Sequence, residues 1–164
     1  MKRLSLKREL KIEDYFHKVS KDLVNYLASR RINTLIVGNN KGWKQNIKLS
    51  RRNNQNFVQI PFYKLIQKLE YKCKLRGIKL EVISEEYTSK CSFLDLESIG
   101  KHIHRGRRIK RGLYRTNSGI LINADVNGSF NILRKCKPNA FNSFKLDGNG
   151  ILGVVVHPLV KSIR

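Results

Sequence analysis

Acidic residues are few and unevenly placed in this sequence, so they are the first candidates for chemistry. Twelve Asp and Glu stand against 34 Lys and Arg, for a formal net charge of +22. Glu85 and Glu86 directly follow a predicted strand, and Asp125 stands alone in a basic stretch at the start of a predicted helix. Carboxylates at strand ends and at a helix start can hold Mg²⁺ ions that clamp a scissile phosphate and activate water.

These acids also have a simpler interpretation. Asp125 could cap the predicted helix, and Glu85 and Glu86 could face solvent. A surplus of positive charge this large favours a polyanionic partner, and nucleic acid is the commonest one. Composition therefore indicates nucleic-acid binding, but it does not by itself indicate a nuclease.

A basic stretch without any acid between Glu97 and Asp125 is the second candidate. The runs 109–114 and 119–122 flank a turn-like segment and predict a basic β-hairpin. Its cations, together with Trp43 and Lys44, are the predicted nucleic-acid contacts, although Trp43 could equally pin its loop to the core. The seven cations of the stretch are Lys101, Arg105, Arg107, Arg108, Lys110, Arg111 and Arg115.

The elements that must position these residues follow from hydrophobic spacing. Apolar residues recur every three or four positions over 12–27 and predict one helix, with Tyr15 and Tyr26 on its inner face. Residues 34–37 form a β-branched run typical of a buried strand. A second helix is expected from Pro61 to Gly77 and a strand over 79–83, with Leu80 and Val82 facing inward. Strand, helix and strand in this order predict a parallel crossover in an α/β fold.

Length and composition limit the remaining classes. The 164 residues suit one domain, and 40% hydrophobic residues suffice for a core. No apolar run reaches the ~20 residues of a membrane helix, and no signal peptide is recognised at the start. Three cysteines without CxxC spacing favour a reduced compartment, so a cytoplasmic protein without a membrane partner is expected.

Three strings carry a resemblance to a known family. They are Asp14–Ser20 (DYFHKVS), Thr88–Asp95 (TSKCSFLD) and Ile122–Leu133 (INADVNGSFNIL). They resemble TnpB, also called OrfB, the transposon-encoded RNA-guided DNA nuclease that is annotated in many genomes as a transposase. Residues 42–45 and 53–57 resemble one subgroup of it.

The resemblance implies a RuvC/RNase H-like α/β domain with an inserted ribbon, and it implies three segments. Residues 1–87 would be the first part of the domain, 88–122 the ribbon with its basic hairpin, and 123–164 the last helix and tail. It also implies guide RNA and DNA as partners, and Mg²⁺ held by an Asp, a Glu and a second Asp. Asp125 matches the last of these.

Two departures from the family pattern concern catalysis. Gly38 stands where most members carry the Glu, and the related subgroup places it on the neighbouring strand. We therefore assign the role to Glu85, with Glu86 as the alternative. The first Asp of the family lies on a strand before the helix that begins near Ile12, so we expect a truncated chain that binds Mg²⁺ weakly and does not cut DNA alone. A nuclease-dead nucleic-acid-binding remnant and a pseudogene product without function are the alternatives.

The third departure concerns zinc. Most members carry two CxxC pairs in the ribbon, whereas Cys91 here has no CxxC partner. His102 and His104 could join Cys91, but three ligands at this spacing match no known site, and solvent-facing histidines beside a basic hairpin are the simpler interpretation. We therefore expect a ribbon without zinc.

Overall fold

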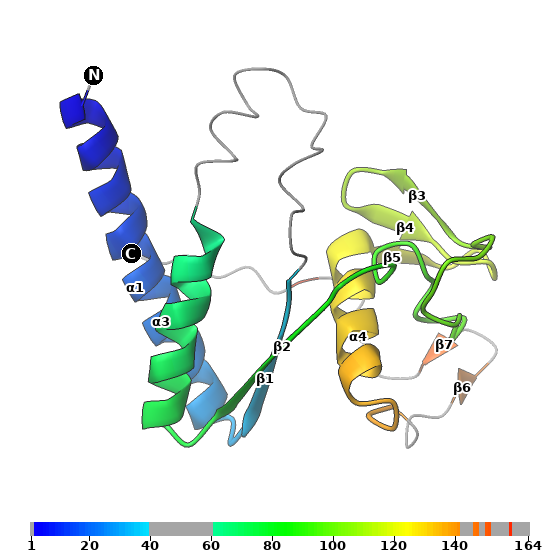
Figure 1. Ribbon diagram of the computed structural model, residues 1–164. Helices are drawn as coiled ribbons and strands as arrows, with labels where there is room; N and C mark the ends of the chain where they lie inside the picture. The colour runs from blue at the N-terminus through cyan, green and yellow to red at the C-terminus, as the bar shows by residue number, and fades with distance from the viewer. Residues whose placement is uncertain (1, 40–60, 142–145, 148–149, 152–157, 159–164) are drawn as a thin grey trace. The chain divides into compact units, whose positions relative to one another are not determined.

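The computed structural model describes residues 2–39, 61–141, 146–147, 150–151 and 158 (Figure 1). The described residues fall into two compact units, one with 2–35 and 61–81 and the other with the remainder. In chain order the elements are α1 (Lys2–Ser29), β1 (Thr34–Gly38), α3 (Phe62–Leu75), β2 (Lys79–Ile83), β3 (Arg107–Lys110), β4 (Leu113–Arg115), β5 (Leu121–Asn123), α4 (Ala124–Cys136), β6 (Leu146–Asp147) and β7 (Gly150–Ile151). No helix among these residues is long and apolar enough to cross a membrane.

The first unit is built on the helix pair α1 and α3, drawn blue and green in Figure 1. Phe16, Ser20, Val24 and Leu27 of α1 are buried, at successive spacings of four, four and three that lie on one helix face. Tyr15 and Tyr26 are 54% and 39% exposed, so their predicted inward placement is wrong. The buried residues of α1 therefore form a narrower stripe than the apolar residues that predicted the helix.

Polar contacts between the two helices flank this stripe. Glu13 of α1 accepts hydrogen bonds from the ammonium groups of Lys68, at 2.5 Å, and Lys64, at 3.1 Å. Lys72 of α3 donates to Ser20 Oγ at 2.7 Å and to the backbone carbonyl of His17 at 2.7 Å. These three cations of α3 are therefore paired with acceptors of α1.

A glycine turn links α3 to β2, as predicted. Gly77 has φ +66°, and the N–H groups of Gly77 and Ile78 bond the carbonyls of Lys74 and Cys73, which is a Schellman end. The predicted strand 79–83 has the same bounds as β2. Val82 was predicted to face inward, but it is 45% exposed, so this prediction is wrong.

Strands β1 and β2 form a two-stranded sheet among the described residues. The Lys79 N–H bonds the Asn33 carbonyl at 2.8 Å, and the Asn39 N–H bonds the Ile83 carbonyl at 2.8 Å. These bonds advance in the same direction along both strands, so the strands run parallel and the predicted crossover is confirmed. β1 is half-buried along its length, not fully buried as expected.

The second unit contains an antiparallel sheet in the order β3-β4-β5. A single strand was expected over 109–114, but the chain turns at Gly112, which has φ +76°, and separates β3 from β4. The first expected strand is therefore two short strands, because a left-handed glycine inside the run ends regular pairing. β4 pairs with β5, which overlaps the second expected strand, 119–122.

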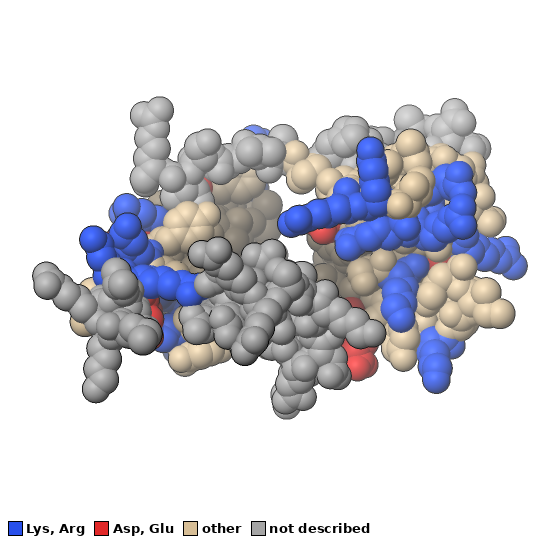
Figure 2. Space-filling model, turned by 90° about the horizontal axis from the view of Figure 1, so that it is seen from above, with Lys and Arg blue, Asp and Glu red and all other residues tan. Residues whose placement is uncertain are grey.

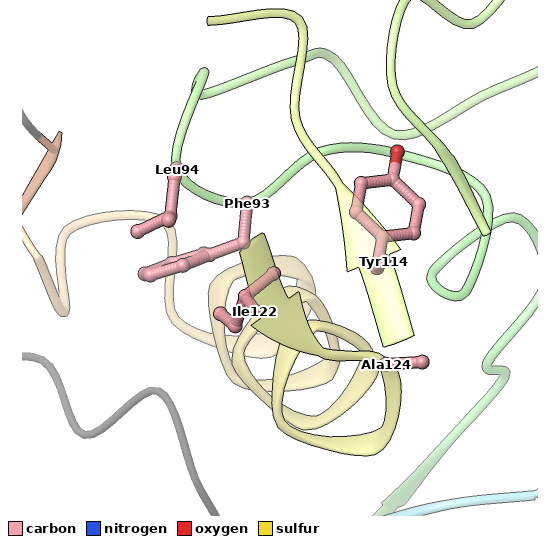
Figure 3. Close-up of a cluster of buried hydrophobic side chains, with 5 residues drawn as sticks. All are labelled: Phe93, Leu94, Tyr114, Ile122 and Ala124. Carbon is pink, nitrogen blue, oxygen red and sulfur yellow. The ribbon is translucent and has the colours of Figure 1, made fainter. Parts of the chain in front are cut away.

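The core of the second unit joins the loop before β3 to the sheet and to α4. Figure 3 shows five of its buried side chains, Phe93, Leu94, Tyr114, Ile122 and Ala124. Phe93 also stacks on Phe130 of α4 with ring centroids 4.7 Å apart. Residues 88–122 thus share one core with α4. The compact units divide the chain elsewhere than the predicted segments 1–87, 88–122 and 123–164.

Candidate functional site

Asp125 lies in the first turn of α4 and does not cap the helix. The cap is Asn123, whose Oδ1 accepts from the N–H groups of Asp125, at 2.9 Å, and Val126, at 3.2 Å. The Asp125 side chain is 85% exposed, and it forms an ion pair with Arg108, whose Nη2 lies 3.8 Å from Oδ1. The capping interpretation of Asp125 is therefore wrong, and its carboxylate points outward at the positive end of the helix dipole.

Glu85 begins the turn that follows β2. Its carbonyl accepts from the Thr88 hydroxyl at 2.7 Å and from the Thr88 N–H at 3.1 Å, which fixes the turn. The Glu85 side chain occupies the space beside Gly38: a Cβ built on Gly38 would lie 2.7 Å from Glu85 Oε2. A larger residue at position 38 would compete directly with the Glu85 carboxylate for this space.

Glu85 and Asp125 line the same groove of about 270 Å³. Glu86 is exposed and is not among the described residues around this groove. Three residues with hydroxyl groups, one cation and three small or apolar residues complete the lining. The full lining is Glu85, Thr88, Ser89, Arg108, Ala124, Asp125, Gly128, Ser129 and Ile132. Residues with two carboxylates and several hydroxyl groups therefore line one groove that is large enough for a hydrated ion.

Two buried asparagines of α4 hold the loop that separates these carboxylates in the sequence. Asn127 accepts from the Phe93 N–H at 2.9 Å and donates to the Cys91 carbonyl at 2.9 Å. Asn131 donates to the carbonyls of Thr88, at 2.9 Å, and Cys91, at 2.8 Å. Sequence analysis gave these residues no role, although Asn recurring every four positions at 123, 127 and 131 indicates one polar helix face.

The predicted basic contacts form an exposed surface on the three-stranded sheet and the loop before it. All seven cations from Lys101 to Arg115 are exposed. Figure 2 shows Lys and Arg side chains crowded over this part of the molecule, at the right of the view. Trp43 and Lys44, the other predicted contacts, lie outside the described residues.

The pairing of β3 and β4 places positive charges opposite one another. Arg107 is the direct cross-strand partner of Arg115. Like charges in this position destabilise a sheet, and no described acid forms an ion pair with either of them. A bound polyanion would offset this repulsion, so the register agrees with a phosphate-binding surface.

A third cluster lies in the loop before β3. Cys91, Glu97, His102 and His104 each offer one ligand atom, and these atoms all lie within 4.8 Å of one another. His104 is largely buried and its ring faces Glu97, so the interpretation of solvent-facing histidines is wrong for His104. The sequence indicates Cys91, His102 and His104 as possible ligands but not Glu97, because cysteine spacing is the only metal-binding signal that was applied to this loop.

The chain is similar to known proteins in sequence and in fold. A family model described as the Cas12f1-like TNB domain matches residues 62–132. A TnpB-like protein of Methanocaldococcus jannaschii is 28% identical over 141 residues, which cover 82% of this chain and 46% of that protein. The chain thus spans about half the length of this curated relative.

A solved structure gives the fold. The cryo-EM structure of a Cas12f1–sgRNA–target DNA complex aligns with a TM-score of 0.60 at 18% identity, over 80% of this chain and 36% of that chain. At this identity the likeness establishes a mixed α/β fold of the Cas12f1 type. Through the family-model match, the TnpB-like relative and the motifs around Cys91 and Asp125, the chain is similar in sequence to TnpB-like proteins.

Proposed function

We propose that this chain is the RuvC-like portion of an RNA-guided DNA endonuclease, with the sheet β3-β4-β5 as its inserted basic ribbon. Guide RNA and DNA are the proposed partners. The observation that carries the proposal is that Glu85 and Asp125, which are distant in the sequence, line one groove. Asp125 matches the last carboxylate implied by the resemblance, and Glu85 is the proposed relocated one. Glu85, rather than Glu86, is the proposed middle carboxylate.

Mg²⁺ is the ion that this groove suits. Its hard oxygen ligands match two carboxylates and the neighbouring hydroxyl groups of Ser89 and Ser129. Asp125 is available, because its ion pair with Arg108, at 3.8 Å, is exposed, and such pairs contribute only ~0–1 kcal/mol. When bound, Mg²⁺ would polarise a phosphate and lower the pKa of a coordinated water.

Gly38 supports the proposed relocation of the middle carboxylate. Most relatives carry Glu at this position, as the resemblance implies, and here the Glu85 carboxylate occupies the space beside Gly38. The Glu85 carboxylate, which follows the end of β2, thus occupies the space that a side chain at position 38, the end of β1, would otherwise fill. The exchange keeps negative charge at the same point of the groove.

We further propose that these 164 residues do not cleave DNA by themselves. Only two of the three implied carboxylates lie among them, and two-metal hydrolysis needs enough negative charge to hold both ions about 4 Å apart. Losing one member of a catalytic unit typically removes most of the rate. Glu85 and Asp125 would then hold one ion weakly.

The test joins a family-type N-terminal segment carrying the third carboxylate to the chain, supplies guide RNA and Mg²⁺, and measures DNA cleavage. We expect activity that Glu85→Ala or Asp125→Ala removes and that the matched control Glu86→Ala keeps. The double variant Glu85→Gly with Gly38→Glu should recover activity that Glu85→Gly alone lacks. Cleavage by the 164 residues alone, abolished by Asp125→Ala, would contradict the proposed inactivity, and activity that survives Glu85→Ala would contradict the assignment.

Nucleic-acid binding by the ribbon has a separate test. Neutralising six phosphates gives a slope of log K against log salt of about −5 for double strands and about −4 for single strands. Replacing Arg107, Arg108, Lys110 and Arg111 together with Ala should flatten the double-strand slope by about 3 to 4. The matched control replaces four exposed lysines of the first unit and should change the slope by less than about 1. These are Lys7, Lys11, Lys21 and Lys74. Equal slopes in both variants would refute the assignment to the ribbon.

A further inference from the structure

We propose that Cys91, Glu97, His102 and His104 form a binding site for a zinc-type transition-metal ion, separate from the carboxylate groove. All four residues lie in the loop between β2 and β3, in one compact unit. Each offers one ligand atom, and all four atoms lie within 4.8 Å of one another. Residue types that seldom gather by chance therefore meet at a single point.

The distances between the ligand atoms already approach those of a tetrahedral site. With metal–ligand bonds of about 2.0–2.3 Å, the ligand atoms of a tetrahedral zinc site lie about 3.3–3.8 Å apart. Cys91 Sγ is 3.8 Å from His104 Nδ1, and Glu97 Oε1 is 3.5 Å from the same nitrogen. Glu97 Oε1 is 3.0 Å from His102 Nε2. Closing the set around an ion needs shifts of about an ångström at most.

The donor types select the metal. One thiolate, two imidazole nitrogens and one carboxylate oxygen are ligands that Zn²⁺ accepts, whereas Mg²⁺ prefers oxygen alone. A Cys91 thiolate and the Glu97 carboxylate together carry two negative charges, which neutralise a dication when both histidines are neutral. The largely buried position favours such a neutral set, because a net charge there would be poorly solvated.

Neighbouring groups orient the ligands. Glu97 Oε2 accepts from the Ser92 N–H at 2.7 Å, which leaves Oε1 directed at the two histidines. The Gly100 N–H donates to the Cys91 sulfur. A metal ion binds this sulfur as a thiolate, so binding would release the thiol proton. Hydrogen bonds to ligand atoms are what a built metal site requires.

The cluster also has an approach from solvent. Glu97 and His102 line a surface depression of about 540 Å³, together with Ile103 and Arg105. An ion could enter from this side without opening the core. Once bound, it would tie the loop 91–104 into a closed unit directly before Arg107, and would so fix the start of the basic strand β3. The role of the ion is therefore structural support of the ribbon.

This proposal departs from the expectation of a ribbon without zinc. That expectation rested on the number and spacing of cysteines. A ligand set of one Cys, one Glu and two His contains no CxxC pair, so cysteine spacing does not indicate it. The ligand set also differs from two CxxC pairs, because only one thiol takes part. Binding of an ion here does not depend on catalysis or on nucleic acid.

The test titrates the full chain, purified under reducing conditions, with Co²⁺ as a spectroscopic probe. One equivalent should produce a thiolate charge-transfer band and the intense visible bands of tetrahedral cobalt, and Zn²⁺ should abolish both. His102→Gln, a change at a partly exposed side chain, should weaken Co²⁺ binding by more than about 100-fold, because losing even a ligand's hydrogen-bond partner costs about 10–100-fold.

Two further variants make the test specific. Cys91→Ser should remove the charge-transfer band, and the control Cys136→Ser should keep it with unchanged intensity. If Cys91→Ser does not fold, His102→Gln and Cys136→Ser still decide the proposal. Absence of tetrahedral bands in the unaltered chain, or bands that persist in His102→Gln at full affinity, would overturn it. Because the titration uses no DNA, its failure leaves the nuclease proposal unaffected.

Discussion

Replacing Asn127 with Ala should destabilise the second unit, because this side chain satisfies two backbone groups where water has no access. Asn127 and Phe93 are both fully buried. In the variant, the Phe93 N–H loses its acceptor at 2.9 Å and remains buried. Leaving a buried donor unsatisfied costs about 1–3 kcal/mol. The Cys91 carbonyl keeps its bond from Asn131, so its contribution to the loss is small.

Two smaller effects have opposite signs. The shortened side chain leaves a void, which weakens packing against Phe93. Ala has a better helix propensity than Asn by about 0.5 kcal/mol, which offsets part of the loss. The expected decrease in the free energy of unfolding is therefore about 2 kcal/mol. The control Ser129→Ala, at an exposed position of the same helix, should change it by less than about 0.5 kcal/mol.

Urea denaturation followed by circular dichroism measures both changes, and hydrogen exchange locates them. The Phe93 amide should exchange slowly in the unaltered chain and much faster in Asn127→Ala. A decrease below about 0.5 kcal/mol with unchanged exchange at Phe93 would refute the argument that the asparagine holds this loop. Retained stability with fast exchange would also contradict it, because the cost is assigned to that one donor.

Three further predictions concern single residues. Asn123→Ala removes the cap of α4 and should lower the free energy of unfolding by about 1 kcal/mol in urea denaturation, whereas an unchanged value would deny it a capping role. Hydrogen bonds from Lys68, and next from Lys64, lower the pKa of Glu13 in the folded chain. The stability that the ionised Glu13 contributes is therefore complete above its ordinary pKa of 4.5 and is lost as the pH falls through the lowered folded pKa. Glu13→Gln should flatten the pH dependence of unfolding in that acidic range, and parallel curves would contradict this. Arg115→Glu should raise the free energy of unfolding by about 0.5–1 kcal/mol, because the new carboxylate pairs with Arg107, and it should weaken DNA binding in a filter assay. A variant in which stability and DNA affinity both rise, or both fall, would contradict the charge argument.

Elements with local signals could be predicted from the sequence. The strand 79–83 has its predicted bounds, because Gly77 ends the preceding helix through a turn that only a few residues specify. The parallel crossover of β1 and β2 follows from the order of elements alone. The side-chain facing failed at Val82 because a two-stranded sheet does not bury alternate residues evenly.

The candidate sites depended on contacts between distant residues. Glu85 and Glu86 cannot be separated by spacing, since periodicity ends with the strand, and only the groove distinguishes them. Glu97 joins the two histidines through a loop without periodic pattern, so no motif indicates it. The role of Asn127 arises from a contact with residue 93, which lies 34 positions away. Such long-range pairs are set by tertiary packing rather than by local propensity.

The central claim is that Glu85 and Asp125 together bind a divalent ion, and paramagnetic relaxation by Mn²⁺ tests it most directly. Mn²⁺ takes the same oxygen ligands as Mg²⁺ and broadens backbone amide signals near its site. The account predicts selective broadening at Gly38, Thr88 and Val126, reversed by excess Mg²⁺ and absent in Asp125→Asn. Broadening that persists in Asp125→Asn would contradict it. So would signals of these three amides that stay sharp when Mn²⁺ is added to the unaltered chain.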